Sequence, residues 1–323
     1  MVGRDHPGDG DLHRQSWLQL PGRWASRCFG CADQMTEGPL LTIRNLRVVY
    51  PGDDGDIRAV RNVSFSLGSE RLAIVGESGS GKSTTARAIM GLIAYPGRVE
   101  AEVMRLGEID LTRLDEKGFR RLRGKRIAMV LQDPKYSLDP VMSVGRQIAE
   151  THRYHFHSSK RAARAAALEM LEAVHIRDPV RVYDQYAHQV SGGMGQRIMI
   201  AMMLIANPDI LIADEPTSAL DVSIQQQVLA VMDEMVKSRG MGLILISHNL
   251  HLVSSFCDRV LVMYSGQIVE VCDARRLYEA RHPYTKGLLA ALPELGHRRA
   301  ELPQLRRDPE WLIDLPAATG AAL

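Results

Sequence analysis

Short apolar runs alternate with turn signals and helix-spaced segments along most of this chain. Residues 41–50 form a strand-like run, and residues 71–75 form a short apolar strand. Residues 209–213 and 242–247 are continuous and apolar, which is typical of strands buried on both faces of a parallel sheet. Residues 83–92 have helical spacing and end at a cluster of glycine and proline. Strands that alternate with helices predict an α/β fold with a parallel sheet.

The middle and the start of the chain depart from this alternation. Residues 143–175 are rich in Ala, Leu, Glu and Arg and contain no proline, which predicts an inserted helical subdomain at about 140–200. Residues 1–34 show no hydrophobic period and no apolar segment long enough for a signal peptide. We expect either that translation starts at Met35 or that this first segment is disordered.

Composition excludes few functions but narrows the compartment. Apolar residues make up 45% and charged residues 24% of the 323 positions, and the net charge of +2 implies no general attraction to nucleic acid. The longest dense apolar stretch, 198–206, is too short to cross a bilayer, so we expect any membrane role to be peripheral. The four cysteines suit a reducing cytosol. Cys28 and Cys31 form a C-x-x-C pair that we expect to be incidental, because no second pair accompanies it.

A glycine-rich segment follows the strand at 71–75. It reads Gly76-Glu77-Ser78-Gly79-Ser80-Gly81-Lys82-Ser83 and fits the pattern G-x-x-x-x-G-K-[ST], with the helix-spaced segment directly after it. Glycines let successive backbone N–H groups curl around phosphates, and the helix N-terminus adds positive potential. Lys82 can reach the outer phosphates, and the Ser83 hydroxyl can hold Mg²⁺. The pattern predicts a nucleotide site but does not by itself separate ATPases, GTPases and kinases.

The strand at 209–213 leads into two carboxylates. Asp214 stands at the carboxyl end of this strand, where it would bind Mg²⁺ directly or through water. Glu215 follows it and would orient and polarise an attacking water. A solvated strand end would be an equal alternative if the phosphate-binding segment were absent.

A second glycine-rich segment precedes the acidic strand. It reads Ser191-Gly192-Gly193-Met194-Gly195-Gln196 and resembles the signature of ABC transporter ATPases. Further positions match this family in its order along the chain, although each would be unremarkable alone. Tyr50 matches the aromatic that stacks on adenine, Gln132 the glutamine that senses Mg²⁺ and the attacking water, and His248 the histidine that contacts the γ-phosphate.

The resemblance implies the fold class and the ligands. It implies a P-loop NTPase domain of the ABC ATPase type, with a parallel-sheet core, an antiparallel β subdomain and a helical subdomain. It places this domain at residues 39–290, after an extension at 1–38 and before a short tail at 291–323. The implied ligands are ATP and Mg²⁺. Two such domains would face each other head to tail, with ATP held between them.

The resemblance also assigns roles to residues. The implied ATP-binding residues are Tyr50, Gly76, Glu77, Ser78, Gly79, Ser80, Gly81, Lys82, Ser83 and Thr84. The implied catalytic residues are Glu215, His248 and Gln132, and the implied Mg²⁺ ligands are Ser83, Gln132 and Asp214. The signature residues would act on the nucleotide of the second domain, and they are Ser191, Gly192, Gly193 and Gln196. The loop that joins the two domains would be Ser218-Ala219-Leu220-Asp221.

The signature departs from the family at one informative position. Gly195 stands where close relatives carry Arg or Lys. Because glycine inside a helix is less favourable than most residues, we expect a weaker signature helix here.

The tail narrows the type of transporter. The segment His282-Pro283-Tyr284-Thr285-Lys286-Gly287-Leu288-Leu289-Ala290-Ala291-Leu292-Pro293 resembles the one that follows the ATPase core in importers of oligopeptides, dipeptides and nickel. The resemblance implies a peripheral subunit at the cytoplasmic face of the inner membrane. Its partners would be two permease subunits, a second and non-identical ATPase, and an extracytoplasmic solute-binding protein, with no nucleic acid.

Several alternatives stay open at this point. No cysteine follows Cys272, whereas many peptide-type members have a cysteine-bearing tail, so a nickel importer remains an alternative. A nickel-sensing cluster at His152, His155 and His157 is conceivable, but we expect these histidines to face solvent. A non-transport ABC ATPase would usually carry two cassettes or a long coiled-coil insert. A module with a dead site is not supported, because its catalytic residue types are all present.

Overall fold

The computed structural model describes residues 38–53, 55–131, 137–217, 220–292 and 311. The chain divides into the units Met1–Thr36 and Glu37–Leu323, and the described residues belong to the second. Our expectations for the start of the chain and for the Cys28–Cys31 pair lie outside the described residues, and so do Gln132, Ser218 and Ala219. The predicted domain boundaries stay a prediction.

A six-stranded sheet forms the centre, in the order β11-β10-β3-β9-β8-β7. Its strands are β3 (Arg71–Val75), β7 (Ile127–Val130), β8 (Ile210–Asp214), β9 (Gly242–Ile246), β10 (Arg259–Tyr264) and β11 (Gln267–Asp273). All neighbours are parallel except β10 and β11. The carboxyl ends of β3, β8 and β9 therefore share one edge, which is where α/β folds build ligand sites.

A second sheet of five strands is antiparallel. It follows the order β2-β1-β5-β6, and β4 pairs with β1. The strands are β1 (Leu41–Tyr50), β2 (Ile57–Leu67), β4 (Arg98–Glu100), β5 (Val103–Leu106) and β6 (Ile109–Asp110). The register between β1 and β2 shifts at several points, which is typical of β-bulges.

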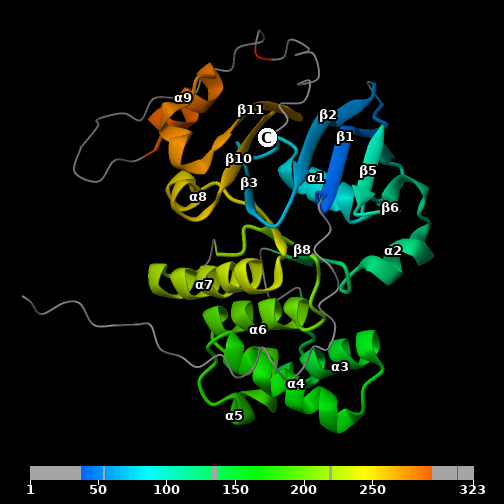
Figure 1. The fold of residues 1–323 in the computed structure, drawn as a ribbon, viewed down its shortest axis with the longest axis vertical. Helices are drawn as coiled ribbons and strands as arrows, with labels where there is room; N and C mark the ends of the chain where they lie inside the picture. Colours follow the sequence, from blue (N-terminus) through cyan, green and yellow to red (C-terminus); the bar gives the residue numbers. More distant parts are fainter. Residues whose placement is uncertain (1–37, 54, 132–136, 218–219, 293–310, 312–323) are drawn as a thin grey trace, which may run out of the picture. The chain divides into compact units, whose positions relative to one another are not determined.

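The helices gather in two groups. Around the sheets run α1 (Lys82–Ile89), α2 (Glu116–Leu122), α7 (Val222–Arg239), α8 (Leu250–Phe256) and α9 (Pro283–Ala290), with the 3₁₀ turns η1 (Leu111–Arg113) and η4 (Ala274–Glu279). A group without strands contains α3 (Val144–Phe156), α4 (Lys160–Ala173), α5 (Pro179–Tyr183), η3 (Ala187–Gln189) and α6 (Gly192–Leu204). Figure 1 shows this second group together, in green, beyond α7.

The helix-rich stretch predicted at 143–175 contains a break. His157 adopts a left-handed conformation with φ of 51° and ends α3. The Ser159 side chain then caps α4 by accepting from the Ala162 N–H at 3.2 Å.

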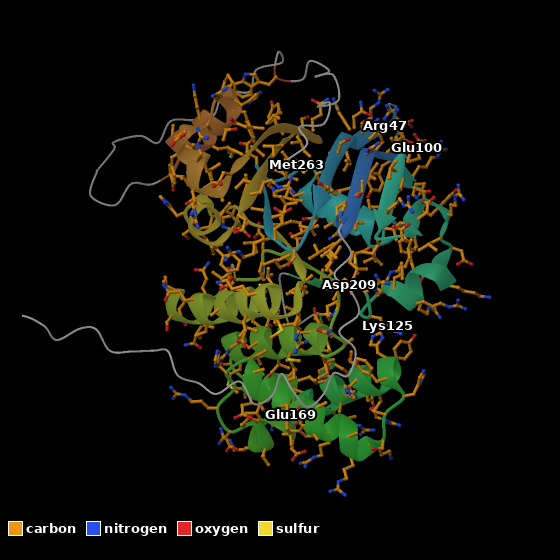
Figure 2. The ribbon with its side chains drawn as sticks, viewed as in Figure 1. Arg47, Glu100, Lys125, Glu169, Asp209 and Met263 are labelled. Carbon is orange, nitrogen blue, oxygen red and sulfur yellow. The ribbon has the colours of Figure 1, made fainter. Side chains whose placement is uncertain are left out.

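Alternation along the central strands builds two cores. On β8, Leu211 and Ala213 face the core shared with the helical group, whereas Ile210 and Ile212 face the core shared with the antiparallel sheet and α1. Full burial of each such leucine or isoleucine contributes about 1.5–3 kcal/mol. At the opposite edge of the sheet, Arg126 forms an ion pair with Asp209, which Figure 2 labels.

This architecture confirms the predicted fold class. It contains a parallel-sheet core, an antiparallel β subdomain and a helical group, as the ABC ATPase resemblance implied. In the described part of the chain, no helix is both long enough and apolar enough to span a bilayer.

Candidate functional site

The phosphate-binding loop connects the end of β3 to the start of α1. Two of its glycines cannot be replaced without strain. A Cβ on Gly76 would lie 2.2 Å from the Met263 carbonyl oxygen, and one on Gly81 would lie 2.6 Å from the Ala59 carbonyl oxygen. Gly81 also has a φ of 99°, which side-chain-bearing residues rarely adopt. Figure 2 labels Met263 on β10. The loop is thus wedged between the two sheets. Ser78 and Gly79 in the middle of the loop are exposed, and successive backbone N–H groups in such a loop can bind phosphate.

Lys82 holds the loop from inside. Its Nζ donates to the Gly76 carbonyl at 2.8 Å and to the Glu77 carbonyl at 2.7 Å, and the residue is 8% exposed. Burial lowers the pKa of this ammonium, while the carboxylates of Glu215 and Asp214 raise it. The cation therefore lies within the electrostatic reach of both acidic residues.

Asp214 ends β8 beside the start of α1. Burial raises the pKa of its carboxyl, whereas a hydrogen bond with Ser83 lowers it. A hydroxyl and a carboxylate in direct contact offer two oxygen ligands to a hard cation, so these residues fit a Mg²⁺ site. Gln132, the third predicted ligand, lies outside the described residues.

Glu215 and His248 lie together at the same edge. Glu215 has a φ of 49° and donates its N–H to the Ile246 carbonyl at 2.9 Å. Its Oε1 is 3.1 Å from Nδ1 of His248. A left-handed glutamate costs about 1–2 kcal/mol and is typical of functional sites. The structure brings the two predicted catalytic side chains into contact, since β8 and β9 are neighbours.

Tyr50 ends β1 and is half-buried. A Cβ on Gly97 would lie 2.7 Å from its Cε1, so the ring packs closely over this glycine. The Ala59 carbonyl of β2 touches Gly81, as described above. The antiparallel sheet that carries Tyr50 is therefore joined to the phosphate-binding loop.

The signature segment starts α6 and faces outward at its first residues. Ser191 caps the helix by accepting from the Met194 N–H at 3.4 Å, and both Ser191 and Gly192 are exposed. A Cβ on Gly193 would meet Ile224 of α7 at 2.8 Å. Gly195 does not interrupt the helix, since its N–H donates to the Ser191 carbonyl at 2.8 Å.

Gln196 differs from the other signature residues. It is 3% exposed, and its Nε2 donates to the Pro216 carbonyl at 2.5 Å. The structure thus directs its side chain into its own chain, behind the segment that carries Glu215. Of the predicted joining loop, Asp221 is described as the cap of α7, accepting from the Ile224 N–H at 2.9 Å, and Leu220 packs against the core.

One contact of the loop had no signal in the sequence. The Tyr284 hydroxyl accepts a hydrogen bond from the Glu77 N–H at 2.9 Å. The two residues are 207 positions apart. The segment around Tyr284 suggested the transporter type but gave no reason to connect it to the loop.

The three histidines that we expected to face solvent are not all exposed. His157 is exposed, whereas His152 and His155 are half-buried. His152 Nδ1 pairs with the Ser158 Oγ at 2.8 Å. Burial lowers the pKa of both His152 and His155. Across the described ranges, no group of three or more His, Cys, Asp or Glu side chains is placed to hold a metal.

Comparison with known proteins gives the family. The family model for ABC transporters matches residues 60–218. The dipeptide transport ATP-binding protein DppD of Escherichia coli K12 is 46% identical over 268 residues, which cover 82% of each chain. The chain belongs to the ABC transporter family. As a member, it is an ATP-binding protein that hydrolyses ATP, which confirms the predicted activity.

Two further comparisons agree with this assignment. The glutathione import ATP-binding protein GsiA of Escherichia coli K12 is 44% identical over 88% of this chain and 47% of its own length. The solved dimer of the ATP-binding cassette MJ0796 in a post-hydrolysis state, bound to ADP and phosphate, has a TM-score of 0.64 and 26% identity. That comparison covers 73% of this chain and 99% of the cassette.

Proposed function

We propose that this chain is the ATPase subunit of an importer that takes up dipeptides or other short peptides across the inner membrane. The observation that carries the solute class is the 46% identity, over 82% of both chains, to a dipeptide transport ATP-binding protein. The tail segment beginning at His282 supports the same group of importers. No described contact favours nickel over peptides.

ATP would bind with its phosphates in the loop Gly76–Ser83 and its adenine on Tyr50. Nζ of Lys82 would donate its hydrogen bonds to oxygens of the outer phosphates in place of the Gly76 and Glu77 carbonyls. Ser83 and Asp214 would hold Mg²⁺ together with Gln132, and the bound ion would neutralise phosphate charge during hydrolysis. Their mutual hydrogen bond supports this assignment because it brings two hard oxygen ligands together.

Glu215 would accept a hydrogen bond from the attacking water. His248 would contact the γ-phosphate, and its contact with Glu215 supports a shared position at the reacting end of the nucleotide. In-line transfer of a phosphoryl group needs mainly positioning and charge stabilisation, which these side chains can supply.

A second cassette would complete the site. Ser191, Gly192 and Gly193 would bind the nucleotide on the phosphate loop of a homologous ATPase partner, in a heterodimer. The exposure of Ser191 and Gly192 at a helix N-terminus supports this role, because such a terminus attracts anions. The pair would act with two permease subunits and an extracytoplasmic binding protein, at the cytoplasmic face of the membrane.

Replacing Lys82 tests the function. Lys82→Ala should abolish ATP binding and uptake of a labelled dipeptide without unfolding the chain, because one buried cation is lost and the core is untouched. Lys237→Ala is a matched control, since Lys237 is a largely exposed lysine paired with Asp233 on α7. Normal uptake in Lys82→Ala cells would refute the proposal. If Lys82→Ala abolished nickel uptake but left dipeptide uptake unchanged, nickel would be the transported solute. If the chain purified from membranes carried no bound permease, the importer role would be refuted.

A further inference from the structure

Tyr284 contacts the phosphate-binding loop, although it lies 207 positions after Glu77 in the sequence. Its side chain is fully buried, and its hydroxyl accepts the Glu77 N–H at 2.9 Å. That N–H belongs to the same peptide group as the Gly76 carbonyl. The Gly76 carbonyl in turn accepts from Nζ of Lys82 at 2.8 Å. One peptide plane is therefore held from both sides, by a tyrosine hydroxyl and by the phosphate-contacting lysine.

The start of α9 is fixed so that Tyr284 reaches this peptide. The Glu270 carboxylate on β11 accepts the Arg281 N–H at 2.7 Å and the His282 N–H at 3.4 Å. Nδ1 of His282 caps the helix by accepting the Tyr284 N–H at 3.2 Å. Pro283 occupies the first helical turn, where its missing N–H is not needed. The helix start is thus tethered by its own residues and by the edge strand.

Aromatic packing holds the Tyr284 ring in place. Its centroid lies 4.5 Å from that of Tyr264 and 6.0 Å from that of Trp311. Tyr264 directly follows Met263, whose carbonyl is the group that a Cβ on Gly76 would strike. The ring is therefore wedged against the same strand end that supports the loop.

From these contacts we propose that Tyr284 is a positioning residue for ATP binding. Its hydroxyl fixes the plane of the Gly76–Glu77 peptide and so sets where Lys82 and the first turn of the loop stand before the nucleotide arrives. A preorganised loop loses less conformational freedom on binding, which raises affinity. The His-Pro-Tyr segment is then part of the nucleotide site rather than a mere continuation of the fold. This inference rests on the proposed function, because it assumes that ATP occupies the loop.

The test removes one oxygen atom. Tyr284→Phe keeps the ring and its aromatic contacts but leaves the Glu77 N–H without this acceptor. We expect the full chain to bind ATP about fivefold more weakly, as the loss of one neutral hydrogen bond would produce. The KM for ATP should rise with kcat nearly unchanged. Hydrogen exchange at the amide of Glu77 should become faster without nucleotide.

Tyr264→Phe is the matched control. It makes the same change within the same aromatic cluster, and no hydrogen bond of the Tyr264 hydroxyl is found among the described residues. ATP affinity in this variant should stay at the wild-type value. An equal loss of affinity in both variants would make Tyr284 a packing residue and overturn the proposal.

Other outcomes separate the inference from the function on which it rests. Wild-type ATP affinity in Tyr284→Phe, with the Glu77 amide still protected, would overturn the positioning role and leave the ATPase role intact. A loss of affinity accompanied by loss of exchange protection throughout α9 would also overturn it, since the helix itself would have loosened. Failure of the wild-type chain to bind ATP would instead refute the proposed function.

Discussion

Glu215 combines a strained, left-handed backbone with a side chain that is a candidate for catalysis. Its left-handed backbone places the carboxylate 3.1 Å from His248 at the shared edge of β8 and β9. Without this turn of the backbone, Glu215 would extend β8 and its side chain would point to the opposite face of the sheet from that of Asp214. We interpret the strain as the means by which the Glu215 carboxylate stays at the edge of the sheet beside His248.

Glu215→Gln should separate ATP binding from hydrolysis. The amide has the size of the carboxylate but cannot polarise water as a negative charge does. We expect turnover to fall by roughly 10²–10⁴-fold, the usual range for loss of a general base, with ATP affinity retained. Steady-state phosphate release and equilibrium ATP binding would measure the two effects. Glu234→Gln, at an exposed position of α7, is the control. Wild-type turnover in Glu215→Gln would show that the water is oriented by another group.

Local sequence was sufficient to propose site residues whose pattern depends on neighbours in the chain. The glycine loop, Asp214 and Glu215 could be identified because strand, turn and carboxylate are adjacent in the chain. The inward direction of Gln196 and the contact of Tyr284 could not, because their partners are 20 and 207 positions away. Such contacts depend on how strands are ordered in the sheet, which local pattern does not specify.

At the scale of the element, α9 depends on a titratable cap. Nδ1 of His282 accepts the Tyr284 N–H, so the imidazole must be neutral at that nitrogen. Burial lowers the pKa of His282 below its ordinary value of 6.5, and Glu270 raises it in part. The unfolded chain therefore takes up the proton first as the pH falls. The contribution to stability is complete above about 6.5 and is lost as the pH drops through the lowered folded pKa.

Replacing this cap should flatten the pH dependence of stability. His282→Asn keeps a side-chain acceptor at the cap but does not titrate. We expect the wild type to lose up to about 1 kcal/mol more than the variant between pH 7.5 and 5.5, the usual scale of a lost N-cap. Urea unfolding at both pH values measures the difference. His152 and His155 contribute in the same window in both proteins, so identical pH dependence would show that His282 does not contribute.

Composition predicted the helical regions but not the single residues at which one helix ends and the next begins. The absence of proline at 143–175 indicated a helical region correctly, but nothing in composition identified the left-handed His157 between α3 and α4. Gly195 raised an expectation of a weaker signature helix. The structure has α6 beginning at Gly192 because Ser191 caps it and its later residues are buried.

At the scale of the whole molecule, the two sheets differed in how far sequence could predict them. Continuous apolar runs predicted three of the parallel strands, β3, β8 and β9, since both faces of that sheet are covered. No prediction was made for β7 or β10. The antiparallel subdomain followed only from the family resemblance, because β4, β5 and β6 are short and β1 pairs irregularly. Strands of two to four residues carry too little alternation to be recognised alone.

In the proposed pair of cassettes, the molecule as a whole would present one half of each of two sites. The loop and its acidic edge would bind one nucleotide, whereas Ser191 and Gly192 are exposed at the start of α6 and would face the other. If these residues act on a partner's ATP, Ser191→Ala should leave ATP binding by the isolated chain unchanged. It should lower ATP turnover of the assembled transporter roughly tenfold or more, because a hydrogen bond to a charged phosphate is worth about 1.5–3 kcal/mol.

Ser159→Ala provides the control for this experiment, since Ser159 caps α4 as Ser191 caps α6. Each change removes one N-cap serine at a similar cost of about 1 kcal/mol, so helix stability alone would affect both variants alike. Turnover lost only in Ser191→Ala would indicate a direct role for the signature serine. Weaker ATP binding by the isolated Ser191→Ala chain would instead place that serine at its own chain's nucleotide. The head-to-tail arrangement would then be wrong, because a site completed in trans cannot lose affinity when its partner is absent.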